Sequence, residues 1–364
     1  MEARAPQSQE WKQIDNFLNE TLRKDIKWSL KDEYPLAFEE KNLANIRIIE
    51  EQGNILSHAV LKPTIIKTHW HVFKVGFIGS VVTNESHRGQ GLSQSVIQSC
   101  IQAAEQQDCD FAMLWTDLFD FYQKFGFEVA GSEIALQVNT NFKSSTKKDL
   151  RILDTAQVSP HDILKLYNRH NLKTLRTAID IQKYLKIPNS EVFTGWNRLT
   201  NQLEAYCVLG KGADFHNYIH EWGGSVSALL SLVESIQEKK NESITLITPP
   251  QCENLIRQME ALGAQKQFGV LGMIKIINPT NFCKKIKKGA RALGHDQFIF
   301  EFRDGTYYFG YGQDVYQTTA DSDMVRLVFG PLKADQIHEF SNQTLEIFKE
   351  LFPIPFWVWG WDSI

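Results

Sequence analysis

Apolar and polar positions in the first part of the chain switch between helical and alternating spacing in a regular order. Apolar side chains at helical spacing from Trp11 to Leu22 predict an opening amphipathic helix. Apolar runs on both sides of the turn 51–54 predict a hairpin, and 72–83 predicts a third strand. The spacing then predicts a helix at 92–106, a strand at 111–115, a short helix ending near Phe125 and a strand at 128–138. This order predicts a mixed, partly parallel sheet with helices on its faces.

A second segment repeats this order after a polar stretch at 141–149, whose lysines and serines are typical of a linker. The pattern predicts a helix from about 163, strands at 191–194, 204–209 and 217–222, a helix at 225–236, a strand at 243–247, a helix through 255–259 and a strand at 269–277. We therefore expect three domains, at 1–142, 149–278 and 279–364.

The last segment combines a basic stretch, a hairpin and an apolar tail. The lysines within 283–289 indicate a solvated helix face. A hairpin at 298–310 and a helix through 345–351 follow. The tail, residues 352–364, has two prolines and three tryptophans at alternating positions, which predicts an extended conformation. Because chain ends normally fray in solvent, so apolar a tail must dock against the rest of the protein.

Composition and charge restrict the class of protein. The 364 residues are 43% hydrophobic, enough to bury more than one core. We find neither the ~18 uninterrupted apolar residues of a membrane helix nor the apolar run of a signal peptide. Five cysteines without CxxC spacing indicate reduced thiols, and a formal charge of −4 does not favour nucleic-acid binding. We expect a cytoplasmic protein without membrane or nucleic-acid partners, and assembly into a homo-oligomer stays open.

The run from Arg88 to Ser93 lies between a predicted strand and a predicted helix and has the residues of a pyrophosphate-binding turn. Gly89 and Gly91 let the backbone turn tightly and expose N–H groups, and Arg88 adds a positive charge. The following helix points its N-terminus, with its partial positive charge, at the same place. An ordinary strand-to-helix turn with a surface arginine is the alternative. The corresponding stretch of the second repeat, 221–224, begins with a glutamate, so we expect no pyrophosphate site there.

Two motifs resemble those of the GNAT (GCN5-related N-acetyltransferase) superfamily, in that family's order and at its separation. The first, Arg88-Gly89-Gln90-Gly91-Leu92-Ser93, is similar to the R/Q-x-x-G-x-G/A fingerprint, with a serine in the last place. The second, Tyr122-Gln123-Lys124-Phe125-Gly126-Phe127, resembles the pattern that closes the same fold. The whole layout resembles bacterial N-acetyltransferases of the enhanced intracellular survival type. It implies an α+β (α/β-like) fold: tandem GNAT folds with mixed twisted sheets and flanking helices, and a small α+β, sterol-carrier-like C-terminal domain.

The resemblance implies acetyl-CoA as cosubstrate and assigns roles to particular residues. In the family, the pantetheine pairs with the strand before the turn, here Val81, Val82 and Thr83. Tyr122 would be the general acid toward the departing thiolate, and the terminal carboxylate of Ile364 would be the base. The pyrophosphate would lie on the turn itself, formed by Arg88, Gly89, Gln90, Gly91, Leu92 and Ser93. The implied reaction is acetyl transfer to a primary amine of a small molecule or peptide.

The chemistry of acyl transfer can be compared with these residue types directly. The reaction needs a neutral amine, a stabilised oxyanion and a protonated leaving thiolate. A tyrosine of ordinary pKa, about 10, keeps its proton at neutral pH and can donate it. A terminal carboxylate, of ordinary pKa about 3.5, is a useful base only where desolvation raises its pKa, and three tryptophans would supply that desolvation. A core tyrosine and a tail that only packs are the structural alternatives for Tyr122 and Ile364.

Two other functions stay open. The chain could transfer a longer acyl chain in the manner of N-myristoyltransferase, another tandem GNAT protein with a catalytic terminal carboxylate. It could also be a non-catalytic sensor that binds acyl-CoA or lipid through its third domain; the tyrosine argues against this, because a sensor needs no acid. We expect no metal site, since neither His69 with His71 nor His216 with His220 has a third ligand at matching spacing.

Overall fold

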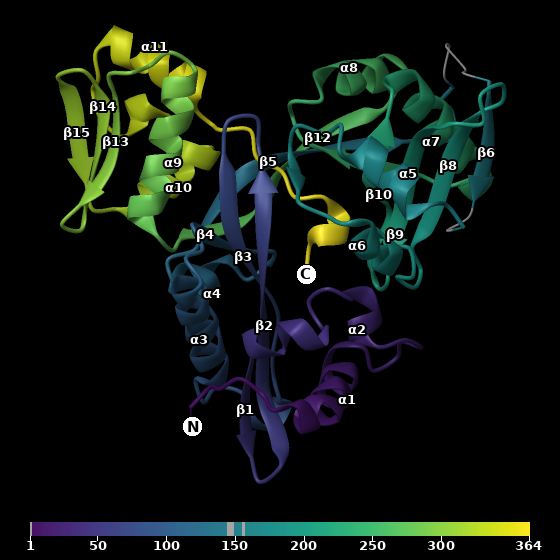
Figure 1. Ribbon diagram of the computed structural model, residues 1–364, viewed down its shortest axis with the longest axis horizontal. Coiled ribbons are helices and arrows are strands. Elements are labelled where there is room, and N and C mark those ends of the chain that lie inside the picture. The colour runs from purple at the N-terminus through teal and green to yellow at the C-terminus, as the bar shows by residue number, and fades with distance from the viewer. Residues whose placement is uncertain (1, 144–148, 155–156) are drawn as a thin grey trace.

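The computed structural model describes residues 2–143, 149–154 and 157–364. Figure 1 shows a lower lobe formed by the first segment, a right-hand lobe formed by the second and a left-hand lobe formed by the last. The mixed fold expected from the sequence, a large sheet with flanking helices, is confirmed. Part of the predicted linker, 144–148, lies outside the described residues. Within the described residues, no helix has the length and apolar character needed to span a bilayer.

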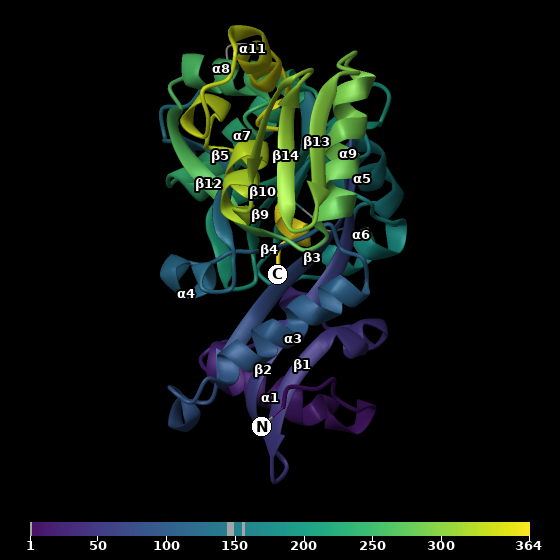
Figure 2. The ribbon, with the colours of Figure 1, turned by 90° about the vertical axis from the view of Figure 1, so that its left-hand side faces the viewer.

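The elements of the first segment follow the predicted order closely. The opening helix buries Ile14, Phe17 and Leu18 along one stripe, as its apolar spacing requires. A further short helix at Leu30–Glu33 was not predicted, because a single turn is too short to show periodicity. The elements are α1 (Trp11–Leu22), α2 (Leu30–Glu33), β1 (Ile46–Glu51), β2 (Asn54–Lys67), β3 (Val72–Thr83), α3 (Leu92–Gln106), β4 (Phe111–Leu114), α4 (Phe119–Gln123) and β5 (Glu128–Val138). Figure 2 shows α3 lying across the strands of this lobe.

The second segment repeats the order with three elements that the sequence pattern does not predict. These are β6, β7 and α6; the two strands are short and β7 has only two residues. The elements are β6 (Leu150–Asp154), α5 (Pro160–Tyr167), β7 (Lys173–Thr174), α6 (Ala178–Tyr184), β8 (Glu191–Asn197), β9 (Leu203–Lys211), β10 (Asp214–Gly224), α7 (Val226–Lys240), β11 (Ile244–Thr248), α8 (Glu253–Ala261) and β12 (Gln265–Ile276).

In the described part of the chain, one sheet of twelve strands runs through both segments, in the order β1-β2-β3-β4-β12-β5-β11-β10-β9-β8-β6, with β7 beside β2. Strand β12 enters between β4 and β5 and is antiparallel to both. On its other edge, β5 pairs with β11. The two repeats therefore exchange strands and share one continuous hydrophobic core.

The C-terminal lobe packs a small sheet against three helices. Its hairpin, with the predicted turn at Asp304 and Gly305, is confirmed, and a third strand continues it. Buried rings of Phe298, Phe300 and Phe309 form its centre. The elements are α9 (Pro279–Ala292), β13 (Phe298–Arg303), β14 (Thr306–Tyr311), β15 (Asp314–Thr318), α10 (Asp321–Phe329) and α11 (Asn342–Leu351).

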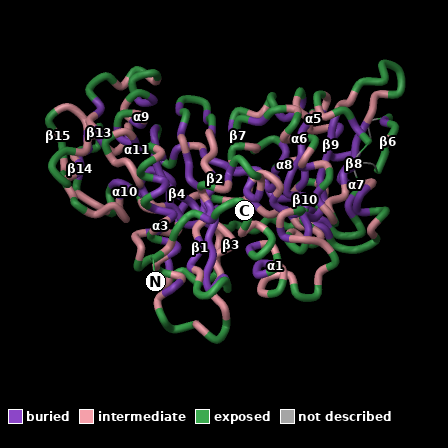
Figure 3. Tube along the Cα trace, turned by 60° about the horizontal axis from the view of Figure 1, so that its bottom comes forward, coloured by how far each residue is buried: buried purple, intermediate pink, exposed green. Residues whose placement is uncertain are grey.

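The tail leaves this lobe and crosses to the junction of the two repeats (Figure 1). The prediction that it docks is confirmed: Trp357, Trp359 and Trp361 are each at most 1% exposed. The tail is extended except for a short 3₁₀ turn at Gly360–Asp362. In Figure 3 the C-terminus lies at the middle of the molecule, among strands with many buried positions.

The indole of Trp359 offers a direct test of this docking. It lies 4.2 Å from the ring of His170 and 5.0 Å from that of Trp222, between ring centroids, and its Nε1 donates a hydrogen bond to the carbonyl of Leu172. We expect Trp359→Ala to lower the free energy of unfolding by about 3–5 kcal/mol in a urea titration. The control Leu199→Ala, at a side chain 96% exposed, should change it by less than about 0.5 kcal/mol. A loss below about 1 kcal/mol for Trp359→Ala would mean that the tail is not part of the core.

Candidate active site

Strands β3 and β4 run parallel and then separate, which leaves one edge of β3 open. Their pairing ends at Phe77 and Met113, and β4 stops at Leu114 whereas β3 continues to Thr83. Beyond Phe77, none of the described strands pairs with this edge of β3. The N–H and C=O groups along 79–83 that face this edge are therefore available to an extended ligand.

A bulge reshapes β3 where the open edge begins. The pairing with β2 shifts between His58 and Val60, and Ser80 on β3 has a left-handed φ of 48°. The Nδ1 atom of His58 donates a hydrogen bond of 2.9 Å to the carbonyl of Ser80. Burial lowers the pKa of His58 to about 4, so the imidazole is neutral and carries its hydrogen on Nδ1. A neutral histidine of the neighbouring strand thus stabilises this unusual backbone conformation.

The turn from Arg88 to Ser93, which we call the cradle, joins this open edge to α3. Gly89 and Gly91 have φ values of 78° and 76°, so the tight turn inferred from these glycines is confirmed. Gly91 is the N-cap of the 15-residue helix α3, and the free N–H groups of the first helical turn lie next to it. The guanidinium of Arg88 is exposed and contacts only Glu85, at 3.4 Å, among the described residues. The cradle can therefore hold an anion at the end of the open edge.

Tyr122 lies on the short helix α4 and is buried among aromatic rings. Its ring is 5.0 Å from that of Phe121 and 6.2 Å from that of Phe127, and its apolar cluster includes Ile78 of β3. Burial raises the pKa of Tyr122 to about 12, so the phenol keeps its proton at neutral pH.

A groove of about 860 Å³ separates α3 from the end of α4. It begins at Gln94, directly after the cradle, and reaches Lys124 and Phe125, which follow Tyr122. An elongated ligand bound at the cradle could extend along it. Its lining includes Gln94, Ser95, Gln98, Ser99, Lys124 and Phe125.

Ile364 lies against β3 at Gly79. A methyl group on Gly79 would be only 2.9 Å from the carboxyl carbon of Ile364, so the close approach requires a glycine. The side chain of Ile364 packs on the cluster formed by α1, α2 and Val82, whereas Tyr122 belongs to the cluster that contacts Val81. Successive residues of a strand point to opposite faces. The tyrosine and the chain end are therefore associated with opposite faces of β3.

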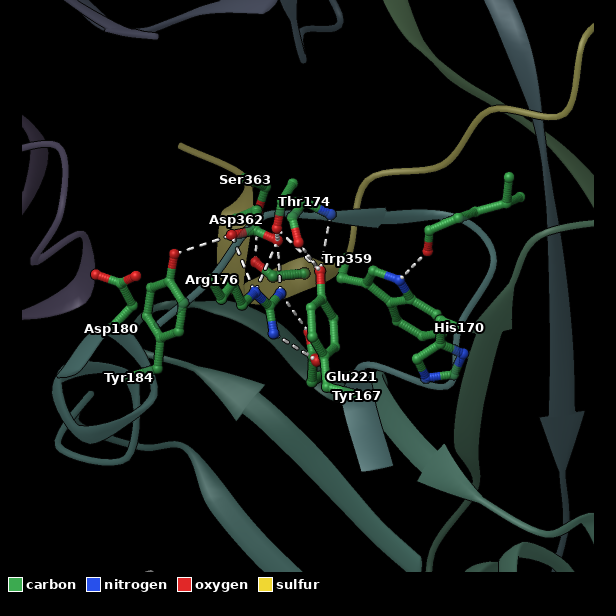
Figure 4. A network of polar contacts seen from close by, with 12 residues as sticks. Tyr167, His170, Thr174, Arg176, Asp180, Tyr184, Glu221, Trp359, Asp362 and Ser363 are labelled. Carbon is green, nitrogen blue, oxygen red and sulfur yellow. Dashed lines mark hydrogen bonds and ion pairs between the residues drawn. The ribbon is translucent and has the colours of Figure 1, made fainter. Parts of the chain in front are cut away.

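A buried ion network holds the tail in this position (Figure 4). The guanidinium of Arg176 is 2.6 Å from Asp362 and 2.8 Å from Glu221. Tyr184 donates a hydrogen bond of 2.9 Å to Asp362, and Tyr206 donates one of 3.0 Å to Glu221. Burial alone would raise the pKa of Asp362, but the charges of Arg176 and Lys62, together with the hydrogen bonds from Arg176 and Thr174, outweigh burial and lower it. Asp362 is therefore ionised at neutral pH.

Two buried lysines, one from each repeat, bind the backbone of the same turn. Lys62 of β2 donates to the carbonyl of Asp362 at 3.2 Å. Lys211 of β9 donates to the carbonyls of Gly360 and Ser363 at 2.8 and 2.6 Å. Burial lowers the pKa of both lysines, that of Lys211 to about 7. The position of the chain end is therefore determined by both repeats.

The pattern of the sequence does not predict this network, although the sequence contains one signal. Asp362 is the only charged residue in the apolar tail, and a charge carried into a core needs a partner. Its partner Arg176 lies in a segment where the spacing of apolar residues predicts no helix or strand. From the sequence, Glu221 is only the residue that replaces the cradle arginine in the second repeat. In the structure, 221–224 belong to β10, and Ser225 caps α7 directly afterwards.

A cavity of about 420 Å³ opens beside this network, at the edge of β2 between β1 and β7. Tyr184 and Asp362 are part of its wall. Three carboxylates and three cationic side chains line it, so charge alone does not favour either sign of ligand. The charged residues are Glu39, Asp180, Asp362, Lys41, Lys62 and Arg176.

The shifted pKa of Lys211 predicts a pH dependence of stability. The folded-state value is about 7, and the ordinary value of lysine is 10.5. Between these values the unfolded state binds more protons, so the free energy of unfolding rises with pH. Relative to Lys211→Met, wild-type stability should increase by up to about 1.4 kcal/mol per pH unit between pH 7 and 9, measured by urea titration. Between pH 5 and 6 the difference should stay constant; a constant difference from pH 7 to 9 would contradict the expectation.

Comparisons with known proteins agree with this geometry. A family model described as an acetyltransferase (GNAT) domain matches residues 2–130. A comparison with curated proteins gives no significant sequence match.

Three solved structures match almost the whole chain. A GCN5-related N-acetyltransferase from Anabaena variabilis is 14% identical, with a TM-score of 0.68 and coverage of 98% of this chain and 97% of that one. A probable N-acyltransferase from Enterococcus faecalis is 15% identical, with a TM-score of 0.66 and coverage of 97% and 96%. Eis1 from Mycobacterium abscessus is 12% identical, with a TM-score of 0.61 and coverage of 99% and 98%. At such identities the likeness shows the fold alone.

The family match and the shared fold together confirm the resemblance found in the sequence. Residues 2–130 form a domain of the GNAT acetyltransferase family, within a chain that has the fold of Eis1 and of these other acyltransferase-like structures over nearly its full length.

Proposed function

We propose that the protein is an acetyl-CoA-dependent N-acetyltransferase that acetylates a primary amine of a small molecule or peptide. The observation that carries the proposal is the open edge of β3, which ends at the cradle and has Tyr122 and the chain end associated with its opposite faces. An acyl group bound at this edge would be approached by an acid from one side and by a base from the other.

The cosubstrate would bind along the open edge and the cradle. The pantetheine would pair with the backbone of Val81, Val82 and Thr83, in the way that an added strand pairs with a sheet edge. The pyrophosphate would accept hydrogen bonds from the N–H groups of Gly89 to Ser93 and would contact Arg88. The groove between α3 and α4 supports this path, because it starts beside the cradle and reaches the residues that follow Tyr122.

The transfer needs two proton movements. The amine nitrogen attacks the thioester carbonyl carbon and loses a proton to the terminal carboxylate of Ile364, directly or through one water. When the C–S bond breaks, Tyr122 donates its proton to the thiolate. The tyrosinate then regains a proton from solvent, and the Ile364 carboxyl releases to solvent the proton that it took from the amine. The products are an N-acetyl amine and free CoA. Tyr122 holds its proton at neutral pH and can donate it, and its raised pKa makes it a weaker acid than an ordinary tyrosine.

The alternatives have less support. The domain match and the three compared structures concern acetyl- and acyltransferases, and none indicates a myristoyl donor. A sensor would need the cradle, but it would not need Tyr122 as a proton donor.

Replacement of Tyr122 tests the acid. We expect Tyr122→Phe to lower kcat by about 10²–10⁴ and to leave acetyl-CoA affinity nearly unchanged, because the ring stays while the proton is lost. Arg88→Glu, as the contrast, should weaken acetyl-CoA binding in calorimetry because it replaces a phosphate contact by repulsion. A Tyr122→Phe variant with wild-type turnover on an amine panel would reassign the role.

Extension of the chain tests the base. Two glycines added after Ile364 move the carboxylate and keep the tryptophans and Asp362 in place. We expect kcat to fall by about 10²–10⁴ while the melting temperature is preserved. Deletion of residues 361–364, the comparison, should lower the melting temperature because it removes Trp361 and Asp362. Full turnover in the extended form would show that the tail is only structural.

A further inference from the structure

The C-terminal lobe contains a second feature that could bind a ligand, far along the chain from the cradle. A groove of about 520 Å³ lies between α9 and β13, which are neighbours in Figure 2. Five cationic side chains and one carboxylate line it. They are Lys284, Lys287, Lys288, Arg291, Arg303 and Glu301.

Four of these cations form one row on α9. Positions 284, 287, 288 and 291 are three or four residues apart, so their side chains share a face about 10 Å long. This is the basic stretch that the sequence interprets as a solvated helix face; Lys284 and Lys288 are indeed exposed, and together with Lys287 they line the groove. Like charges at this spacing repel each other and destabilise a helix. The row of cations therefore destabilises α9, and folding alone does not explain why these residues are there.

The charges of the groove are only partly compensated. Lys287 forms an ion pair with Glu301, and Arg303 lies 3.6 Å from the same carboxylate. No carboxylate of the described residues forms a salt bridge with Lys284, Lys288 or Arg291. Only Arg291 lies in the last turn of α9, where the helix dipole favours a cation. At least two lysines thus lack a structural explanation, in a chain whose formal charge is −4.

The shape of the groove restricts the kind of anion. Its volume is within the range of small-molecule sites, and the partly exposed Phe302 forms an aromatic wall beside the cations, whereas Phe300 is buried in the core. Phe302 packs against Tyr307 at 4.7 Å between centroids, which holds one ring in place. A flat membrane would not fill a concave groove, and a nucleic-acid strand would need a longer row of cations than one face about 10 Å long. A compact ligand with several negative charges and a planar body would fill the groove.

We propose that this groove binds a small organic polyanion of nucleotide size, with phosphate groups on the α9 cations and a planar group against the aromatic wall. The proposal does not depend on the acetyltransferase activity, because none of its residues belongs to the cradle, to the open edge of β3 or to the tail.

Calorimetry with ATP and with inorganic tripolyphosphate as probes tests the proposal on the full chain. We expect ATP to bind with one site in the groove, and Lys284→Glu combined with Lys288→Glu to weaken it at least tenfold. The control combines Lys165→Glu with Lys186→Glu, two exposed lysines outside the groove, and makes the same change of net charge. It should keep ATP affinity within twofold. Tripolyphosphate should bind more weakly than ATP, because it has no planar group.

Two further measurements separate the groove from other sites. Arg88→Glu should keep ATP affinity in the groove; loss of ATP binding in this variant alone would assign it to the cradle and overturn the proposal. Sedimentation with vesicles of phosphatidylcholine and 30% phosphatidylglycerol, about the anionic content that attracts basic segments, examines a lipid surface. Vesicle binding that depends on Lys284 and Lys288, without ATP binding, would overturn the small-ligand proposal, as would equal ATP affinity in the wild type and the double variant.

Discussion

The buried ion pair between Arg176 and Asp362 is the interaction on which the arrangement of the candidate site depends. Moving a guanidinium and a carboxylate out of water costs several kcal/mol for each ion, and their attraction offsets this only with good geometry and further hydrogen bonds. Here the guanidinium contacts two carboxylates, and each carboxylate also accepts a hydrogen bond from a tyrosine hydroxyl. Removing Arg176 would leave two buried carboxylates without the cation that they share. The network therefore holds the last turn of the tail in one position.

This network also suggests what the second repeat contributes. In the first repeat the strand before α3 leads into a glycine turn that can bind an anion; in the second, the strand leads straight into α7. Glu221, on that strand, instead binds Arg176 and so helps to hold the tail. The second repeat has the same order of elements without a cradle, and its residues Arg176 and Glu221 hold the tail in place.

Much of the fold followed from local pattern, and the tertiary pairing did not. The spans of α3 and β3 matched the spacing of their apolar residues, and the glycine turn between them had the expected backbone. The insertion of β12 between β4 and β5 could not be read from periodicity, because any apolar strand satisfies the same local rule. Lys62 and Lys211 were missed for a similar reason: each is an ordinary polar position of a strand, and only the distant tail explains its burial.

The exchange of strands has a consequence for how the chain folds. Strand β5 belongs to the first segment, yet both of its neighbours, β12 and β11, come from more than a hundred residues later. In a chain that stopped after the first repeat, β5 would have two unpaired edges and β4 one, and bare edges of apolar strands promote aggregation. The family domain in this protein is thus an incomplete folding unit, and contacts this distant in sequence are slow to form. The two repeats should gain and lose their structure together, as a single cooperative unit.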